Sequence, residues 1–208
     1  MNKKVYSTSK LALTFIGCIV FMMGQFNASA QVQGPNYGLS TIVKTGQAST
    51  WQNASSACVA DNRYASVSLG SGSASDTMEI DNFHFNVPAN AQIEGITITI
   101  NKGAYGEGIT DNMIKLTYNG AICGSNHAIM DEWPANVQNF TYGGNDDQWG
   151  INLTPEVINS YSFGIAFSVS NSAFSTNVGK ANIDYVNISV TYKTGHDNMA
   201  YTFNTSSK

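Results

Sequence analysis

Charged side chains are scarce in this chain, because only 12% of its residues are Asp, Glu, Lys or Arg. Lys3, Lys4 and Lys10 lie within the first thirty residues, and beyond them seven basic residues stand against fourteen acidic ones, a formal charge of −7. Such a chain repels the phosphates of nucleic acids and of anionic lipids. The composition therefore excludes both as partners and predicts a neutral, hydrogen-bonding surface rich in Asn, Ser, Thr and Gly.

Long hydrophobic runs are also lacking, since the longest apolar segment covers only residues 11–23. A membrane-spanning helix needs about 20 apolar residues. The three lysines before this segment and Ala28-Ser29-Ala30 after it are typical of an export signal. We expect a cleaved signal peptide (1–30), one domain (31–193) and a flexible tail (194–208), in a secreted, cell-surface or periplasmic protein without a transmembrane anchor.

A lipoprotein signal is an alternative at this end of the chain, because Cys18 follows Gly17. The apolar residues continue past Cys18, where a lipoprotein sequence normally turns polar. We therefore favour cleavage before Gln31 over attachment of lipid to Cys18.

Cysteine is rare, and only Cys58 and Cys123 remain beyond the signal segment. Two cysteines in an oxidising compartment usually form a disulfide bond. We predict a bond between them, with two separately buried thiols as the alternative. No histidine lies in a pattern that indicates a catalytic thiol.

Helical periodicity is nearly absent, and short alternating segments rich in Ile, Val, Thr, Tyr and Phe recur between Gly, Asn, Asp and Ser clusters. This pattern predicts an all-β fold, an antiparallel β-sandwich of jelly-roll type. The expected strands are 40–43, 64–69, 77–85, 92–101, 113–118, 121–123, 138–142, 163–170 and 183–192. Residues 31–38 show no apolar alternation and are expected to be a loose end.

Four local signals refine this prediction. The phase of alternation changes at Gly95, which indicates a β-bulge, and in the last strand, where Ile183 and Tyr185 are expected to face one way and Val186 and the alternate residues after it the other; both strands are expected to bend. Asn119-Gly120 predicts a type I′ hairpin. The single short helix is expected to begin after Thr154 as N-cap, with Pro155 in its first turn, and to end near Asn159.

Six segments together resemble a known family: YASVSL, FHFNVPANAQIEGITITI, the isolated Trp133, YGGNDDQWG, LTPEVINSYSFGIAFSV and IDYVNISVTY. They resemble the jelly-roll-like β-sandwich modules of secreted bacterial proteins and of phage and virion-associated proteins. The resemblance covers residues 53–193 in order. It implies a displayed structural module with no shared catalytic site, and fold similarity is in any case a weak guide to activity.

Loop aromatics are the most plausible binding groups, because a flat ring can stack on a sugar while its polar tip bonds a hydroxyl. Among the loop and strand-end aromatics we expect Trp51, Tyr105 and Tyr142 to be exposed and to bind a ligand. Trp133 and Trp149 are expected to be core or rim plugs. Tyr161 is a further candidate.

Metal and catalytic groups have weaker support. Asn145, Asp146 and Asp147 could offer oxygen ligands to calcium, but a plain turn closed by Trp149 is the favoured interpretation, and no other cofactor is expected. Asp131, Glu132 and Asp184 are the carboxylates with suggestive neighbours for a glycosidase pair, but we expect Asp184 to be an outward or turn-pairing residue, because a strand alternates its faces. His84, His127 and His196 share no metal-ligand spacing.

The sequence therefore favours a non-enzymatic β-sandwich that acts as a surface, matrix or appendage component through adhesion to a protein partner or to copies of itself. The alternative is a carbohydrate-binding module that uses loop aromatics. A hydrolase is the third and least supported hypothesis.

Overall fold

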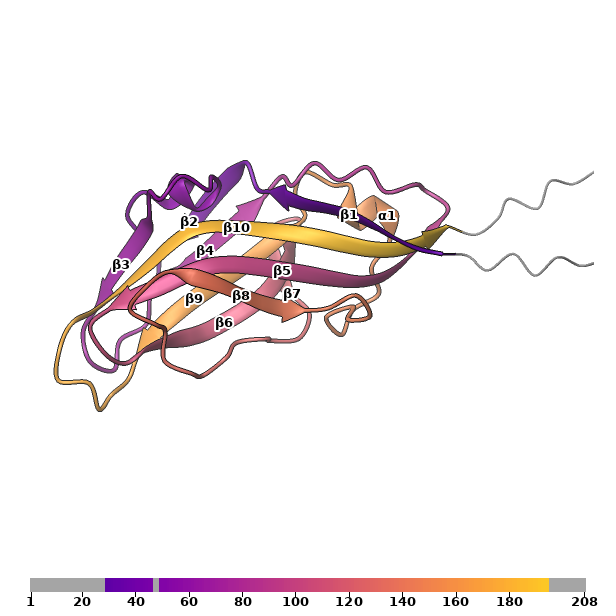
Figure 1. Ribbon diagram of the computed structural model, residues 1–208. Coiled ribbons are helices and arrows are strands. Elements are labelled where there is room, and N and C mark those ends of the chain that lie inside the picture. The colour runs from indigo at the N-terminus through magenta and orange to yellow at the C-terminus, as the bar shows by residue number, and fades with distance from the viewer. Residues whose placement is uncertain (1–28, 47–48, 195–208) are drawn as a thin grey trace, which may run out of the picture.

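Isoleucines alternate with polar residues along one of the two long strands of the described chain, and this alternation creates one buried face. Ile96, Ile98 and Ile100 are at most 1% exposed, whereas Thr97 and Thr99 between them are half-buried. They belong to β5 (Ala91–Tyr105), which pairs antiparallel with β10 (Gly179–Thr194) over almost its whole length. These two long strands form the centre of the first sheet (Figure 1).

The computed structural model describes residues 29–46 and 49–194, which form two antiparallel sheets packed face to face. Sheet A has the order β1-β10-β5-β8, and β3 also pairs with β10; sheet B has the order β2-β4-β9-β6-β7. The remaining strands of sheet A are β1 (Ala30–Tyr37), β3 (Ala65–Leu69) and β8 (Gln138–Gly143). Sheet B contains β2 (Ser40–Lys44), β4 (Thr77–Asp81), β6 (Ile109–Tyr118), β7 (Ala121–Cys123) and β9 (Gly164–Asn171). The predicted all-β sandwich is confirmed.

The core lies between the sheets, where aliphatic and aromatic side chains from both inner faces meet. Met78, Ile80 and Phe167 of sheet B are fully buried, as are Ile188 and Val190 of sheet A. Two sheets that bury their apolar faces against each other are the stable arrangement for strands of this pattern.

The predicted bulge beside Gly95 is present, but the expectation that Ile183 and Tyr185 share a face is wrong, because the irregularity in β10 lies at Asp184 between them. The pairing of β10 with β5 shifts register between Thr191 and Tyr192, opposite Glu94 and Gly95, and again between Ile183 and Tyr185. The second shift leaves Asp184 without a partner in that ladder and turns its side chain to the loop before β3. Asp184 Oδ1 accepts hydrogen bonds from Asn62 N (2.8 Å) and Asp61 N (3.3 Å). Asp184 is thus a buried turn-pairing residue, not an outward one.

The predicted hairpin and helix also form as expected. Asn119 and Gly120 have φ angles of 50° and 72°, which a type I′ turn requires at both central positions. The helix α1 (Pro155–Ile158) has Thr154 as N-cap, whose Oγ1 accepts a hydrogen bond from Val157 N at 3.3 Å. A 3₁₀ turn, η1 (Ala54–Ala57), lies between β2 and β3.

Several predicted strand limits differ from the structure, and two of the differences are informative. The segment expected to be a loose end forms β1, which pairs with β10 from Ala30↔Lys193 to Tyr37↔Asn187. Its side chains are mostly exposed, so it shows no apolar alternation and is held by backbone hydrogen bonds. The strand expected to reach residue 85 ends at Asp81, because Asn82 and His84 have positive φ angles of 62° and 54°.

Candidate functional site

The outer face of sheet A carries an uncharged array of hydroxyl, amide and phenol groups. Successive side chains of a strand point to opposite faces, so the residues between the buried isoleucines and valines face away from the core. The strand pairing places β5 between β10 and β8 in this array. We call these positions the sheet A face: Tyr37, Thr97, Thr99, Asn101, Asn139, Thr141, Tyr185, Asn187 and Ser189.

A pair of tyrosines and two asparagines form the best ordered part of the sheet A face. The rings of Tyr37 and Tyr185 meet edge to face with centroids 5.6 Å apart. The Tyr185 hydroxyl and Asn101 Nδ2 each donate a hydrogen bond to Asn139 Oδ1, both at 2.8 Å. Tyr37 is 38% exposed. The two rings therefore have fixed orientations next to amide groups that can bond a ligand.

No Asp, Glu, Lys or Arg lies on the sheet A face as we define it. Lys193 Nζ of β10 and Glu94 Oε1 of β5 form an ion pair at 2.5 Å, at the bulge and outside this set of residues. A neutral face of this kind can stack a ring on an apolar surface and exchange hydrogen bonds with hydroxyl groups. It offers no charge to recognise an ionic ligand.

Of the three aromatic residues that we predicted to be exposed, one is exposed and two are buried. Tyr105 is 80% exposed at the end of β5, as predicted. The expected exposure of Trp51 and Tyr142 is wrong, because they are 5% and 3% exposed. Trp51 packs edge-on against Phe167 and donates its Nε1–H to Asp76 O at 3.0 Å. Residues from distant strands cover both side chains, which local sequence does not reveal.

The other aromatics lie as the sequence indicates. Trp149 is fully buried and donates its Nε1–H to Ile96 O at 3.0 Å, so it closes the loop after β8 against sheet A. Trp133 is 5% exposed and is part of the core. Tyr161 is 72% exposed, and its ring contacts His84 edge to face with centroids 5.4 Å apart.

Two of the three side chains proposed for calcium accept hydrogen bonds within the protein. Asn145 Oδ1 accepts a hydrogen bond from Thr191 Oγ1 at 3.1 Å, and Asp147 Oδ1 accepts one from Trp149 N at 2.7 Å. Asp146 is exposed on the same turn. Within the described residues, no group of three or more His, Cys, Asp or Glu side chains could hold a metal ion. The loop has the form of the plain turn closed by Trp149.

The predicted disulfide is wrong in this structure, because Cys58 and Cys123 are both free and half-buried. The backbone of Cys58 forms an isolated β-bridge with Tyr185 of sheet A. Cys123 lies on β7, an edge strand of sheet B. Burial and the nearby Asp81 carboxylate raise the pKa of the Cys58 thiol to about 11. Burial also raises the pKa of Cys123. The alternative of two separate thiols is the one that the structure contains.

The carboxylates and histidines with suggestive neighbours are not gathered into one site. Glu132 Oε1 accepts a hydrogen bond from Gly108 N at 2.5 Å, and Asp184 holds the turn described above. His84 is exposed between two buried phenylalanines. His127 Nε2 lies 3.5 Å from Asp147 Oδ2, and its ring packs on Trp149 with centroids 4.0 Å apart. The contacts of Glu132, Asp184 and His127 hold loops together and do not bring the side chains to a common site.

A cluster of buried polar side chains lies between the two sheets, near the C-terminal end of β5. Lys102 continues the inward phase of Ile96, Ile98 and Ile100 and is 1% exposed; Asp111 of β6 is fully buried. Lys102 Nζ lies 2.5 Å from Asp111 Oδ1 and also donates to the Tyr142 hydroxyl. Burial lowers the pKa of Lys102, opposed by the attraction of Asp111.

Asp111 receives three further donors from the surrounding chain. Trp133 Nε1 donates to Asp111 Oδ1 at 2.9 Å, while the Tyr142 hydroxyl and Ile129 N donate to Oδ2 at 2.8 and 2.9 Å. Burial and the adjacent Asp111 raise the pKa of Tyr142, so its hydroxyl keeps its proton. The buried carboxyl group is therefore fully hydrogen-bonded, as the cost of burying a charge requires.

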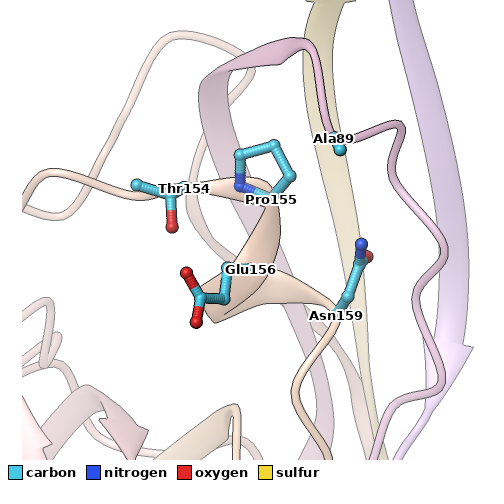
Figure 2. Close-up of a pocket in the computed structure, with 5 residues that line it drawn as sticks. All are labelled: Ala89, Thr154, Pro155, Glu156 and Asn159. Atoms are coloured by element: carbon cyan, nitrogen blue, oxygen red, sulfur yellow. The ribbon is translucent and has the colours of Figure 1, made fainter.

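A hollow of about 370 Å³ lies beside α1, lined by Ala89, Thr154, Pro155, Glu156 and Asn159 (Figure 2). Two of its polar side chains hold the surrounding loops. Asn159 Oδ1 accepts from Val87 N at 2.7 Å and its Nδ2 donates to Val87 O at 2.8 Å, while Thr154 caps α1. No aromatic ring lines the hollow, so it lacks a platform for stacking.

Sequence reasoning missed the most informative residues of both sites. Lys102 and Asp111 lie in the inward phase of their strands, and a charge in that phase is the signal that could have found them. Tyr37 lies in the segment expected to be loose, and only the pairing of β1 with β10 brings it to Tyr185. Residues 1–28 of the predicted signal peptide, Cys18 among them, lie outside the described residues, as do His196 and all but the first residue of the predicted tail. In the described part of the chain, no helix is both long and apolar enough to cross a bilayer.

No family model and no curated protein matches this sequence. Among solved structures, the chain is similar to a CBM4 carbohydrate-binding module at 12% identity and a TM-score of 0.37, over 62% of this chain and 85% of that one. It is similar to the N-terminal cellulose-binding domain of Cellulomonas fimi β-1,4-glucanase C at 14% identity and a TM-score of 0.30, over 60% and 76% of the two chains. A cyanophage Pam1 capsid chain matches at 15% identity and a TM-score of 0.28, over 94% and 100%.

Proposed function

We propose that this protein is an exported, non-enzymatic β-sandwich that acts as a surface or matrix component and adheres to neutral carbohydrate through the sheet A face. One observation carries the proposal: Tyr37 and Tyr185 lie next to an uncharged ladder of Asn and Thr side chains on two paired strands. A sugar presents C–H faces for stacking and hydroxyls for amides, and this face offers both complements.

The chemistry of the face fits an uncharged, hydroxyl-rich ligand better than an ionic or apolar one. Asn139 Oδ1 holds both Asn101 and Tyr185, so the polar groups are ordered before a ligand arrives. Groups that are already fixed lose less conformational entropy on binding. The flat sheet surface suits a polysaccharide chain lying along or across the strands.

A glycan array and a pull-down with insoluble polysaccharides test this proposal on the full chain. We expect Tyr185→Ala and Tyr37→Ala each to weaken retention about tenfold, equivalent to roughly 1.4 kcal/mol of binding free energy. Tyr161→Ala is the control, because Tyr161 is exposed, follows α1 in the chain and is not among the residues of the sheet A face. We expect Tyr161→Ala to bind like the unchanged chain.

Tyr105→Ala tests whether the ligand binds on the sheet A face or at the end of the strands. Tyr105 is more exposed than either tyrosine of the face and lies at the end of β5. If Tyr105→Ala removes binding while Tyr37→Ala and Tyr185→Ala do not, the ligand binds at the strand ends and our assignment is wrong. Retention of no glycan by the unchanged chain contradicts the carbohydrate proposal as a whole.

Self-association is the second candidate function, favoured by apolar side chains on one pair of edge strands. β1 and β2 end the strand orders of their sheets, and Val32, Leu39 and Ile42 on or between them are 59%, 62% and 48% exposed. An edge strand with free backbone groups and exposed apolar side chains can pair with another copy. This contact would build the protein into a matrix or appendage.

Light scattering with size-exclusion chromatography over a range of concentrations tests the second candidate. We expect oligomers of the full chain that dissociate when Ile42→Lys adds a charge to the edge of sheet B. Thr110→Lys, on the inner strand β6, is the control for an added charge elsewhere on that sheet. A monomer at every concentration rules out this route.

A further inference from the structure

The buried cluster of Lys102, Asp111 and Tyr142 places an amine, a carboxyl group and a proton carrier in contact, away from bulk solvent. Lys102 Nζ and Asp111 Oδ1 are 2.5 Å apart, and the two side chains are 1% and 0% exposed. The amine lies 4.5 Å from the ring centroids of both Trp133 and Phe140. Exclusion of water matters here, because an amine and a carboxylic acid condense only where water does not drive hydrolysis.

We infer that Lys102 and Asp111 condense to a covalent cross-link, in which Lys102 Nζ forms an amide with Asp111 Cγ and one water molecule leaves. The link would join β5 of sheet A to β6 of sheet B through the core. It rests on the observed cluster and is independent of what the sheet A face binds.

Each group that is hydrogen-bonded to Lys102 or Asp111 has a role in the proposed reaction. The Tyr142 hydroxyl accepts from Lys102 Nζ and donates to Asp111 Oδ2 at 2.8 Å, so it can pass a proton from the amine to the leaving oxygen. Trp133 Nε1 donates to Oδ1 at 2.9 Å, where negative charge develops when Nζ attacks Cγ. Ile129 N donates to Oδ2, the oxygen that departs.

The reaction balances without an external reagent. The ammonium and carboxylate first become a neutral amine and carboxylic acid by proton transfer through Tyr142. The N–Cγ bond then forms, the Cγ–Oδ2 bond breaks, and the second amine proton leaves with Oδ2 as water. Burial favours each neutral form over the ion pair, and it lowers the pKa of Lys102 in that direction.

Intact mass spectrometry of the denatured full chain tests the inference. We expect a mass lower than that of the sequence between the observed termini by one water molecule. Tryptic digestion should leave the bond after Lys102 uncut, and fragmentation of the resulting peptide should release no separate ions between residues 102 and 111. A chain with its full mass overturns the inference.

Two variants identify the groups involved. Lys102→Met should keep the full mass; if it still lacks one water, the loss comes from another reaction, such as ring closure at Asp111, and the amide is excluded. Tyr142→Phe should gain the link at least about 100-fold more slowly, the effect expected for loss of a positioned proton carrier. Formation at an unchanged rate refutes the role of Tyr142 as proton carrier.

The chain supplies its own control pair. Lys193 Nζ and Glu94 Oε1 are also 2.5 Å apart, but Lys193 is 42% exposed. We expect no amide between these two residues, and trypsin should cut after Lys193. A cross-link there as well would show that proximity suffices and that the buried surroundings of Lys102 play no part.

Discussion

Gly143 and Gly120 form a matched pair that separates the cost of backbone strain from the cost of a steric clash. Their φ angles are 68° and 72°, so an added Cβ strains both backbones to a similar extent. At Gly120 the new carbon has no atom within 4 Å. At Gly143 it would lie 2.3 Å from Ile96 O and 2.6 Å from Trp149 Nε1, the two ends of a buried hydrogen bond.

The expected losses follow from these distances. Gly120→Ala should lower the free energy of unfolding by about 1 to 2 kcal/mol, the cost of a left-handed conformation for a residue with a Cβ. Gly143→Ala should lose this amount, roughly 1 to 3 kcal/mol more for the overpacked site, and about 1 kcal/mol for the weakened Trp149 hydrogen bond. We therefore expect Gly143→Ala to cost about twice as much as Gly120→Ala, or more.

Urea unfolding followed by tryptophan fluorescence measures both variants, with the slope of the transition as a check on two-state behaviour. Trp149 should also change its environment in folded Gly143→Ala but not in folded Gly120→Ala. Equal losses in the two variants would refute the argument that Trp149 closes tightly against sheet A through Gly143.

Two further predictions concern the helix and the thiols. Thr154→Ala should lower stability by about 1 kcal/mol in urea unfolding, because it removes the cap of Val157 N, whereas Thr154→Ser should retain the cap. Alkylation of Cys58 in the folded chain should follow a thiolate pKa of about 11, roughly 100-fold slower at pH 8 than for a thiol of pKa 9.0, as measured by mass on its peptide. Since the folded state holds this proton more tightly, the contribution of Cys58 to stability is present below pH 9.0 and is lost as the pH rises to about 11. If neither Cys58 nor Cys123 is alkylated in urea without a reductant, the two residues form the disulfide bond that the sequence predicted.

The interior of the sandwich brings together polar residues that lie apart in the sequence. Lys102 and Asp111 are nine positions apart, and a short connection brings them to opposite sheets. Tyr142, from a strand much later in the chain, completes their hydrogen bonds. A buried charge pair is often no more stable than an apolar substitute, so its presence here needs a reason beyond stability. The proposed amide supplies one.

The sequence by itself determined the fold class, because alternation along a strand is a local pattern that fixes which face is buried. The phase of Ile96, Ile98 and Ile100 predicted the core face of β5 and the bulge beside Gly95. The turn at Asn119-Gly120 and the cap at Thr154 were also predicted, because each depends on the backbone preferences of adjacent residues.

Only the tertiary structure decided what covers each side chain and which distant groups meet. Trp51 and Tyr142 are buried by strands far away in sequence, so their local setting could not reveal it. The edge strand β1 is held by backbone bonds to β10 and carries almost no apolar pattern, yet it brings Tyr37 to Tyr185. Burial and long-range contact depend on strand order, and strand order is set by the packing of both sheets together.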